Sequence, residues 1–209
     1  MSLKEIIEKY PHPIIGVIGA STPLPGYNPR EAKDLGYKLR DFVEKGGSLF
    51  TGGVPGVGLD VYEGIVGYCE ERGVEDKFFV MLPTDISPPQ EYFDLASRTK
   101  NGKLIVEPAG KDMGERRDYV AEVADSLVVI NGGMGTIDEA VKGLYSGKEV
   151  LCLSNSGGAA EILSKLRLGE IPKLSDMDVD MDLIKTCNSP DEIIGYLINN
   201  KLYKQLRGE

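Results

Sequence analysis

The sequence predicts an α/β protein built on a mostly parallel sheet, and three observations lead to this expectation. Short runs of aliphatic and β-branched residues alternate along the chain with segments of helical periodicity, as in strands joined by crossover helices. Four of these runs end directly in small or glycine-rich turns. The 209 residues contain no repeat and no linker-like stretch, so we expect one domain over residues 1–209.

The first half of the chain alternates strand and helix twice. The expected elements are strands at 14–18, 48–51 and 78–82, a helix that Asn28 caps with Pro29 at its first position and that glycines 46–47 end, and a helix over 59–72 that Gly73 closes. Residues 83–103 are rich in Pro, Ser and Asp and show no period. This stretch is long for a loop, so we expect a flap or a binding segment there that supplies contacts to the ligand.

The second half continues the pattern. The expected elements are strands at 104–106, 126–130 and 150–153, helices over 114–124 and 136–146, a further helix after residues 154–158, and a terminal helix from Ser189 to about residue 205. Acidic residues alternate through 176–182, which suggests an edge strand or an extended segment, whereas the spacing fails the calcium loop of an EF-hand. The fold predicted is therefore Rossmann-like and doubly wound, with six or seven strands and helices on both faces.

Composition excludes several classes of function. A net charge of −9 argues against a nucleic-acid partner, which normally meets a basic face. No apolar run approaches the roughly 20 residues that cross a membrane, and the N-terminus has no apolar stretch of the signal-peptide type. We therefore expect a cytoplasmic protein without a membrane or nucleic-acid partner.

The scarcity of metal-binding residue types narrows the chemistry further. His12 is the only histidine, so a His-dependent triad or a multi-histidine metal site is not expected. Cys69, Cys152 and Cys187 are widely spaced and lack a C-x-x-C pair, which favours reduced, buried thiols. No metal site is predicted.

The glycine-rich turns predict an anion site. In a parallel sheet the turns after the strands share one edge, where backbone N–H groups and helix N-termini can bind phosphate. Neither the P-loop pattern nor G-x-G-x-x-G is present, which disfavours a P-loop NTPase and a standard NAD dehydrogenase. We expect a nucleotide or another small phosphate ligand, bound by residues Gly19, Ser21, Gly52, Gly53, Gly132, Gly133, Gly135 and Thr136.

Two segments carry a family resemblance. Met113-Gly114-Glu115-Arg116-Arg117 and Asn131-Gly132-Gly133-Met134-Gly135-Thr136-Ile137-Asp138-Glu139 resemble the paired M-x-x-R-K and P-G-G-x-G-T-x-x-E motifs of the LOG ("lonely guy") family, often mislabelled lysine decarboxylases. The resemblance spans roughly residues 14–153. It departs at Asn131, where the family has proline, at Arg117, where it has lysine, and in the glycine loop that contains Pro55.

The resemblance implies a nucleoside 5′-monophosphate phosphoribohydrolase, which releases a free base and ribose 5-phosphate. In that family pattern Glu139 and Arg116 are the catalytic residues. Glu139 would stabilise positive charge on the ribose and orient water, and Arg116 would hold the phosphate or the ribose hydroxyls. From the residues alone, Thr136 to Glu139 also fits a capping box, in which Glu139 only accepts a backbone N–H, and Arg117 fits a surface charge.

A second function remains open at this stage. The wider superfamily includes molybdenum-cofactor carrier proteins, so the alternative is a non-catalytic protein that binds a nucleotide or a molybdopterin-type cofactor. The resemblance implies a homodimer and no bound cofactor for the hydrolase. A decarboxylase would need a lysine that holds pyridoxal phosphate, and the sequence identifies none.

Overall fold

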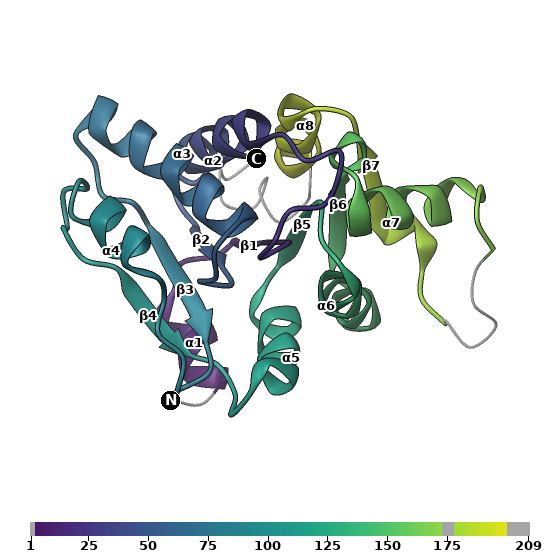
Figure 1. The fold of residues 1–209 in the computed structure, drawn as a ribbon, viewed down its shortest axis with the longest axis horizontal. Helices are drawn as coiled ribbons and strands as arrows, with labels where there is room; N and C mark the ends of the chain where they lie inside the picture. The colour runs from purple at the N-terminus through teal and green to yellow at the C-terminus, as the bar shows by residue number, and fades with distance from the viewer. Residues whose placement is uncertain (1–2, 173–177, 200–209) are drawn as a thin grey trace.

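The computed structural model describes residues 3–172 and 178–199, and seven parallel strands form one sheet within them (Figure 1). The spatial order is β4-β3-β2-β1-β5-β6-β7. The strands are β1 (Ile14–Gly19), β2 (Ser48–Thr51), β3 (Phe78–Leu82), β4 (Ile105–Pro108), β5 (Ser126–Ile130), β6 (Glu149–Leu153) and β7 (Ile184–Cys187). The predicted fold class is confirmed.

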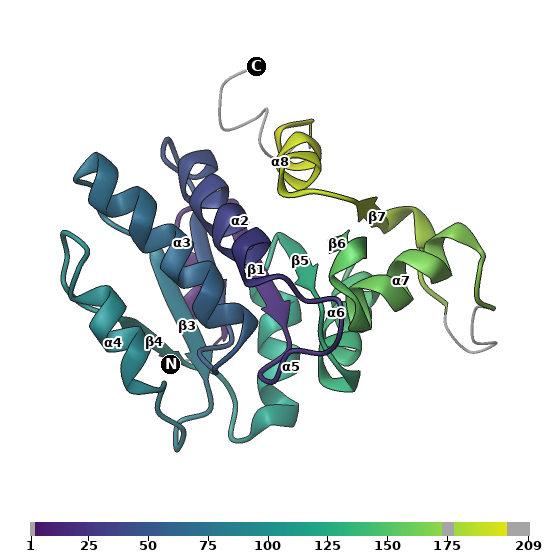
Figure 2. The same cartoon turned by 45° about the horizontal axis from the view of Figure 1, so that its top comes forward.

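Helices cover both faces of the sheet (Figures 1 and 2). One apolar core lies between the sheet and α2, α3, α4 and α8, and the other lies between the sheet and α1, α5, α6 and α7. The helices are α1 (Leu3–Lys9), α2 (Pro29–Phe42), α3 (Val57–Arg72), α4 (Gln90–Ala96), α5 (Met113–Val123), α6 (Met134–Tyr145), α7 (Gly158–Leu168) and α8 (Pro190–Asn199). None of those in the described ranges combines the length and hydropathy needed to cross a bilayer.

Local sequence signals set most of these boundaries. The side chain of Asn28 accepts a hydrogen bond from the Arg30 N–H and caps α2, with Pro29 at the first position as predicted. Gly73 ends α3 in the left-handed conformation, also as predicted. The end predicted for α2 at glycines 46–47 is wrong, because the helix stops at Phe42 and turns lead from there to Gly47.

The prediction for residues 83–103 is corrected by the structure. The segment contains α4, which packs on α3, and none of its residues lines the pocket described below. Tyr92 of α4 is fully buried; its hydroxyl donates to the Val54 carbonyl at 3.1 Å and lies 3.3 Å from Thr51 Oγ1. The segment thus contacts the glycine loop at 52–58 through Tyr92 and stabilises it. It does not form a flap over the pocket.

The ends of the chain differ from expectation in other ways. Helix α1 and strand β7 were not predicted, and β7 pairs with β6 at the edge of the sheet. Within the acidic run, residues 178–180 form no regular element and Met181–Leu183 is a 3₁₀ turn, while 176–177 lie outside the described residues. The terminal helix starts at Pro190 as expected, and its predicted extension to residue 205 also lies outside them.

The order of the strands fixes where a ligand can bind. From β1 the chain builds outward through β2, β3 and β4, and it then returns to place β5 on the other side of β1. The turns after β1 and β5 therefore diverge to opposite faces and leave a crevice at their carboxyl ends, which is the usual ligand site of such sheets.

Candidate functional site

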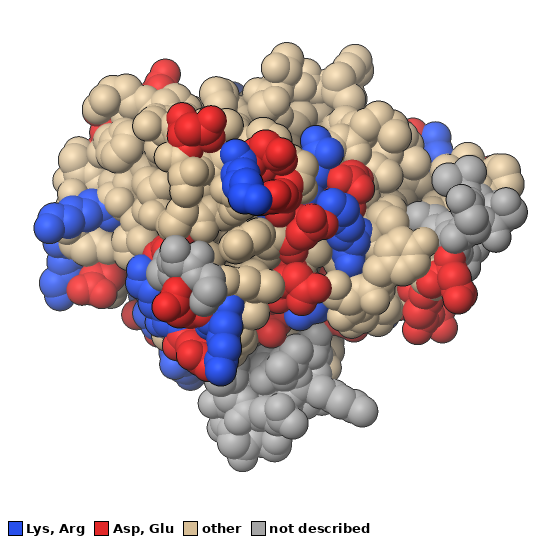
Figure 3. All heavy atoms as spheres, turned by 90° about the horizontal axis from the view of Figure 1, so that it is seen from below, with Lys and Arg blue, Asp and Glu red and all other residues tan. Residues whose placement is uncertain are grey.

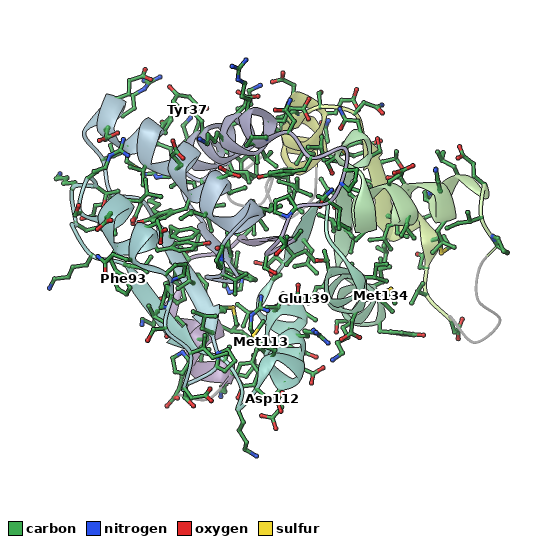
Figure 4. The ribbon with its side chains drawn as sticks, viewed as in Figure 1. Tyr37, Phe93, Asp112, Met113, Met134 and Glu139 are labelled. Atoms are coloured by element: carbon green, nitrogen blue, oxygen red, sulfur yellow. The ribbon has the colours of Figure 1, made fainter. Side chains whose placement is uncertain are left out.

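A pocket of about 300 Å³ opens at this crevice. Its wall comes from the end of β1, from the turns that follow β1, β2 and β5, and from the starts of α3, α5 and α6. The lining residues are Val17, Ile18, Gly19, Ala20, Ser21, Thr22, Leu24, Gly52, Val54, Gly58, Met113, Arg116, Arg117, Gly133, Gly135, Thr136 and Glu139. Figure 4 shows Met113 and Glu139 close together in this region, between the starts of α5 and α6.

Arg116 enters the pocket from α5. Asp112 caps that helix by accepting the N–H groups of Gly114 and Glu115. The Arg116 side chain then runs past the carboxyl end of β3, where its Nε donates to the Met81 carbonyl at 2.9 Å. Arg116 is only 5% exposed, so its guanidinium is a fixed, desolvated charge and not the solvated arginine of a surface helix.

Glu139 meets this guanidinium from α6. Its Oε1 lies 2.9 Å from Arg116 Nη1, and Glu139 is only 4% exposed. Burial raises the pKa of the Glu139 carboxyl, and the neighbouring Arg116 guanidinium offsets part of that rise. The capping-box interpretation of Glu139 is wrong, because α6 begins at Met134 with Gly133 as its cap and the carboxylate faces Arg116.

The start of α6 presents N–H groups to the pocket. The amides of Thr136 and Ile137 both donate to the Gly133 carbonyl, whereas those of Met134 and Gly135 have no acceptor among the described residues. A helix N-terminus carries partial positive charge, which favours an anion there. Of the Gly135 and Thr136 amides expected to bind phosphate, that of Gly135 is thus free and lines the pocket with the two catalytic candidates, whereas that of Thr136 bonds to Gly133.

Six of the eight predicted phosphate-binding residues line this pocket, namely Gly19, Ser21, Gly52, Gly133, Gly135 and Thr136. Gly53 and Gly132 do not. Both have positive φ, 64° and 103°, and a Cβ on either would collide with a neighbouring side chain. Glycine is therefore required at both positions by the conformation of the two turns, which carry the pocket-lining residues.

Gly52 has a further steric role. A Cβ at this position would lie closer than 3.0 Å to Arg116 Nη2. The absence of a side chain lets the guanidinium rest against the backbone after β2 and reach Glu139. The glycine loop and the Arg116–Glu139 pair are therefore parts of one site.

Arg117 belongs to the site, although the sequence suggested a surface charge. It lines the pocket, its Nη1 lies 3.3 Å from Asp138 Oδ2, and its side chain is 32% exposed. Its Nη2 would be 3.1 Å from a Cβ on Gly135, which puts the guanidinium directly against the first turn of α6. Adjacent helix positions normally diverge, so only the tertiary approach of α5 to α6 reveals this placement.

Asn131, which stands where the LOG motif has proline, also has a defined structural role. Its φ of 54° lies in the left-handed region, which the ring of proline cannot adopt. Its backbone N–H donates to Ser156 Oγ at 2.7 Å, a bond that proline could not form. Proline could therefore not replace Asn131 without a change of backbone geometry at the end of β5.

The other reactive residue types lie elsewhere. The three cysteines are unpaired and buried, as predicted, and burial raises the pKa of the Cys69 thiol to about 11. Across residues 3–172 and 178–199, no cluster of three or more His, Cys, Asp or Glu side chains could hold a metal ion. His12 contacts Asp125 at the opposite, amino-terminal end of the strands.

Comparison with known proteins places the fold. No family model matches the sequence, and no curated protein matches it. The solved structure of a protein designated TM1055 is similar at 21% identity and a TM-score of 0.62, covering 90% of this chain and 99% of that one. The molybdenum cofactor carrier protein of Chlamydomonas reinhardtii is similar at 21% identity and a TM-score of 0.58, covering 94% of this chain and 99% of that one.

A third similar structure is DNA processing protein A of Helicobacter pylori, described as binding single-stranded DNA. It has 16% identity and a TM-score of 0.59, and the match covers 93% of this chain and 83% of that one. Identities this low establish a shared Rossmann-like fold and leave the activity to be argued from the site.

Proposed function

We propose that this protein is a LOG-like phosphoribohydrolase, which cleaves the N-glycosidic bond of a nucleoside 5′-monophosphate. One observation carries the proposal: the buried Arg116–Glu139 pair lies in the same pocket as Gly135, whose N–H at the start of α6 is free. A desolvated carboxylate beside an anion site at a topological switch point suits a substrate with a phosphate at one end and a bond of developing positive charge at the other.

The phosphate is assigned to the start of α6. The Met134 and Gly135 amides would donate to its oxygens, and the Thr136 hydroxyl is a further donor on the pocket wall. Arg117 adds a cation against the same turn, so the anion meets both the helix terminus and a guanidinium. Arg116, held by its hydrogen bond to the Met81 carbonyl, would orient the ribose between the phosphate and Glu139.

Glu139 would act at the other end of the substrate, where the N-glycosidic bond is cleaved. As the bond between C1′ and the base nitrogen breaks, electrons leave with the base and C1′ gains positive charge, which a nearby carboxylate stabilises. Water then attacks C1′ and gives a proton to Glu139. The departing base takes up a proton from solvent and Glu139 later releases its own to solvent, so that one water is consumed in all. Such positioned acid–base help contributes roughly 10²–10⁴ in rate.

The environment of Glu139 fits this task. Burial raises the pKa of the Glu139 carboxyl, which makes the carboxylate a better proton acceptor than an exposed glutamate, and the Arg116 guanidinium offsets part of that rise. The pair therefore combines a fixed position with a proton affinity above that of an exposed glutamate.

The carrier function is the second candidate, and one observation favours it. The chain shares its fold over nearly its whole length with the molybdenum cofactor carrier protein of Chlamydomonas reinhardtii and with the molybdenum cofactor binding protein of Rippkaea orientalis. A molybdopterin-type ligand also bears a phosphate, so the start of α6 would suit either ligand.

Binding of single-stranded DNA, by contrast, is not proposed. The net charge is −9, and acidic and basic side chains are interspersed on the face that Figure 3 shows, without a broad basic stripe among its described residues.

A chromatographic assay with AMP, GMP, CMP, UMP and IMP tests the proposal by measuring release of free base. Base release by the purified protein supports the hydrolase. No release from any of the five, with nucleotide binding still measurable by calorimetry, would contradict it and favour the carrier. A carrier should also retain a ligand that absorbs beyond the protein's own spectrum.

A further inference from the structure

The side chain of Asn131 connects the loop after β1 to the turn after β6. Its Oδ1 accepts the Leu24 N–H at 2.9 Å, and its Nδ2 donates to the Leu24 carbonyl at 3.2 Å and to the Ser156 carbonyl at 2.6 Å. The carboxamide thus pairs with Leu24 as another strand would, using both an acceptor and a donor. Asn131 itself is completely buried.

Leu24 belongs to the loop of residues 20–27, which forms one wall of the pocket through Ser21, Thr22 and Leu24. Most of this loop is exposed to solvent, so few apolar contacts hold it. Its ends are fixed by the Val57 N–H, which donates to the Ala20 carbonyl, and by the Tyr27 hydroxyl, which donates to Asp60. Asn131 fixes the middle of the loop through its two hydrogen bonds to the Leu24 backbone, next to the residues that line the pocket.

The backbones on this side approach each other closely. A Cβ on Gly157 would collide with the Pro25 carbonyl, and a Cβ on Gly158 would collide with the Gly132 carbonyl. The loop at 20–27, the turn after β5 and the turn after β6 therefore pack backbone to backbone. Because Asn131 lies between them with φ of 54°, its side chain points to Leu24 and Ser156 and leaves the N–H groups of α6 to the ligand.

We propose that Asn131 is a positioning residue: its carboxamide fixes the 20–27 wall, which lines the same pocket as the phosphate subsite, and thereby sets which ligands, beyond a bare phosphate, the pocket binds tightly. This inference rests on the proposed phosphate subsite at the start of α6. A ligand that reaches the wall benefits from a loop already in place, since ordering a loop on binding lowers affinity. Inorganic phosphate is too small to need the wall.

The test compares two ligands in the full chain by calorimetry, in a Glu139→Gln background so that substrate is not consumed. Asn131→Gly keeps the left-handed backbone accessible and removes all three side-chain hydrogen bonds. The expected result is an AMP dissociation constant raised about tenfold, with that of inorganic phosphate changed less than about twofold. Asn101→Gly is the matched control, because it removes an amide bound to Asp76 far from the pocket lining.

Equal weakening of both ligands, or of neither, would overturn the role of Asn131 while leaving the phosphate subsite intact. A parent protein that binds neither AMP nor phosphate would overturn the proposed function itself. Amide hydrogen exchange in the wild-type protein adds a measurement that needs no variant. The Leu24 N–H should exchange slowly because Asn131 accepts it, and exchange at the rate of an open loop would contradict the inference.

Discussion

The guanidinium of Arg116 lies directly against Gly52, so closely that a Cβ at residue 52 would overlap it. A Cβ at Gly52 would lie closer than 3.0 Å to Arg116 Nη2, while Nη1 of the same guanidinium is 2.9 Å from Glu139 Oε1. The φ of Gly52 is not positive, so alanine fits the backbone there. A side chain at residue 52 would displace the flexible Arg116 side chain and not the backbone of the sheet.

Gly52→Ala should therefore lower base release about a hundredfold while the protein stays folded, because a displacement of about 1 Å at reacting groups has an effect of this size. Gly67→Ala is the matched control. Gly67 lies inside α3 with open space at its Cβ position, so alanine should leave the rate unchanged and add about 0.5–1 kcal/mol to the free energy of unfolding. A Gly52→Ala protein with wild-type rate would show that Arg116 need not touch this backbone.

Arg117 should contribute to phosphate affinity, and Lys142 offers a control of equal charge. Both interact with Asp138, but only Arg117 lines the pocket. Arg117→Gln should raise the dissociation constant for inorganic phosphate about tenfold, whereas Lys142→Gln should change it less than about twofold. Calorimetry at low ionic strength measures both. Equal effects of the two substitutions would indicate that only the net charge matters.

Tyr92 should stabilise the glycine loop without taking part in binding. Tyr92→Phe removes the hydroxyl that meets the Val54 carbonyl and Thr51 and leaves these groups without that partner. We expect the free energy of unfolding to fall by about 1–2 kcal/mol in a denaturant titration. Tyr145→Phe, at an exposed position on α6, should leave it unchanged. A Tyr92→Phe protein as stable as wild type would contradict the bracing role of α4.

The ionisation of Glu139 should make stability depend on pH. Its pKa is raised in the folded protein, so the unfolded chain loses this proton first as pH rises. The stabilisation linked to the protonated form is fully present below the unfolded pKa of about 4.3 and is lost as pH rises through the folded pKa. Glu139→Gln resembles the protonated form, so the variant should melt like wild type near pH 4 and higher than wild type near pH 8. A lower melting temperature at pH 8 would show that the Arg116 contact outweighs burial.

The sequence predicted the centre of the fold because its signals there are local. Strands β2, β3 and β5 begin and end where their apolar runs do, since each is a short buried segment bounded by turn residues. Helix α4 could not be predicted because it has only seven residues and follows two prolines. It is stabilised by Tyr92, which stacks on Tyr62 of α3. Strand β7 mixes Lys185 and Thr186 with apolar residues, as an edge strand can.

The residues of the site likewise fall into those that local sequence patterns predict and those that only tertiary contacts place. Arg116, Glu139 and most of the glycines could be found from motif spacing, because the motifs occupy strand ends that one sheet edge brings together. The placement of Arg117 depends on the angle between α5 and α6, and that of Asn131 depends on a loop more than a hundred residues earlier in the chain. No local pattern carries that information, so tertiary structure was needed to place both residues.

The most direct test of the central claim compares the rate of base release for wild type, Glu139→Gln and Glu161→Gln with the best of the five nucleotides. Glu161 is a half-buried glutamate on α7 that pairs with Lys165 outside the pocket lining, so its substitution controls for the same chemical change. We predict a loss of about 10²–10⁴ in kcat for Glu139→Gln, with nucleotide binding retained, and no change for Glu161→Gln. Equal rates for all three proteins would contradict the assignment of Glu139 as the catalytic carboxylate.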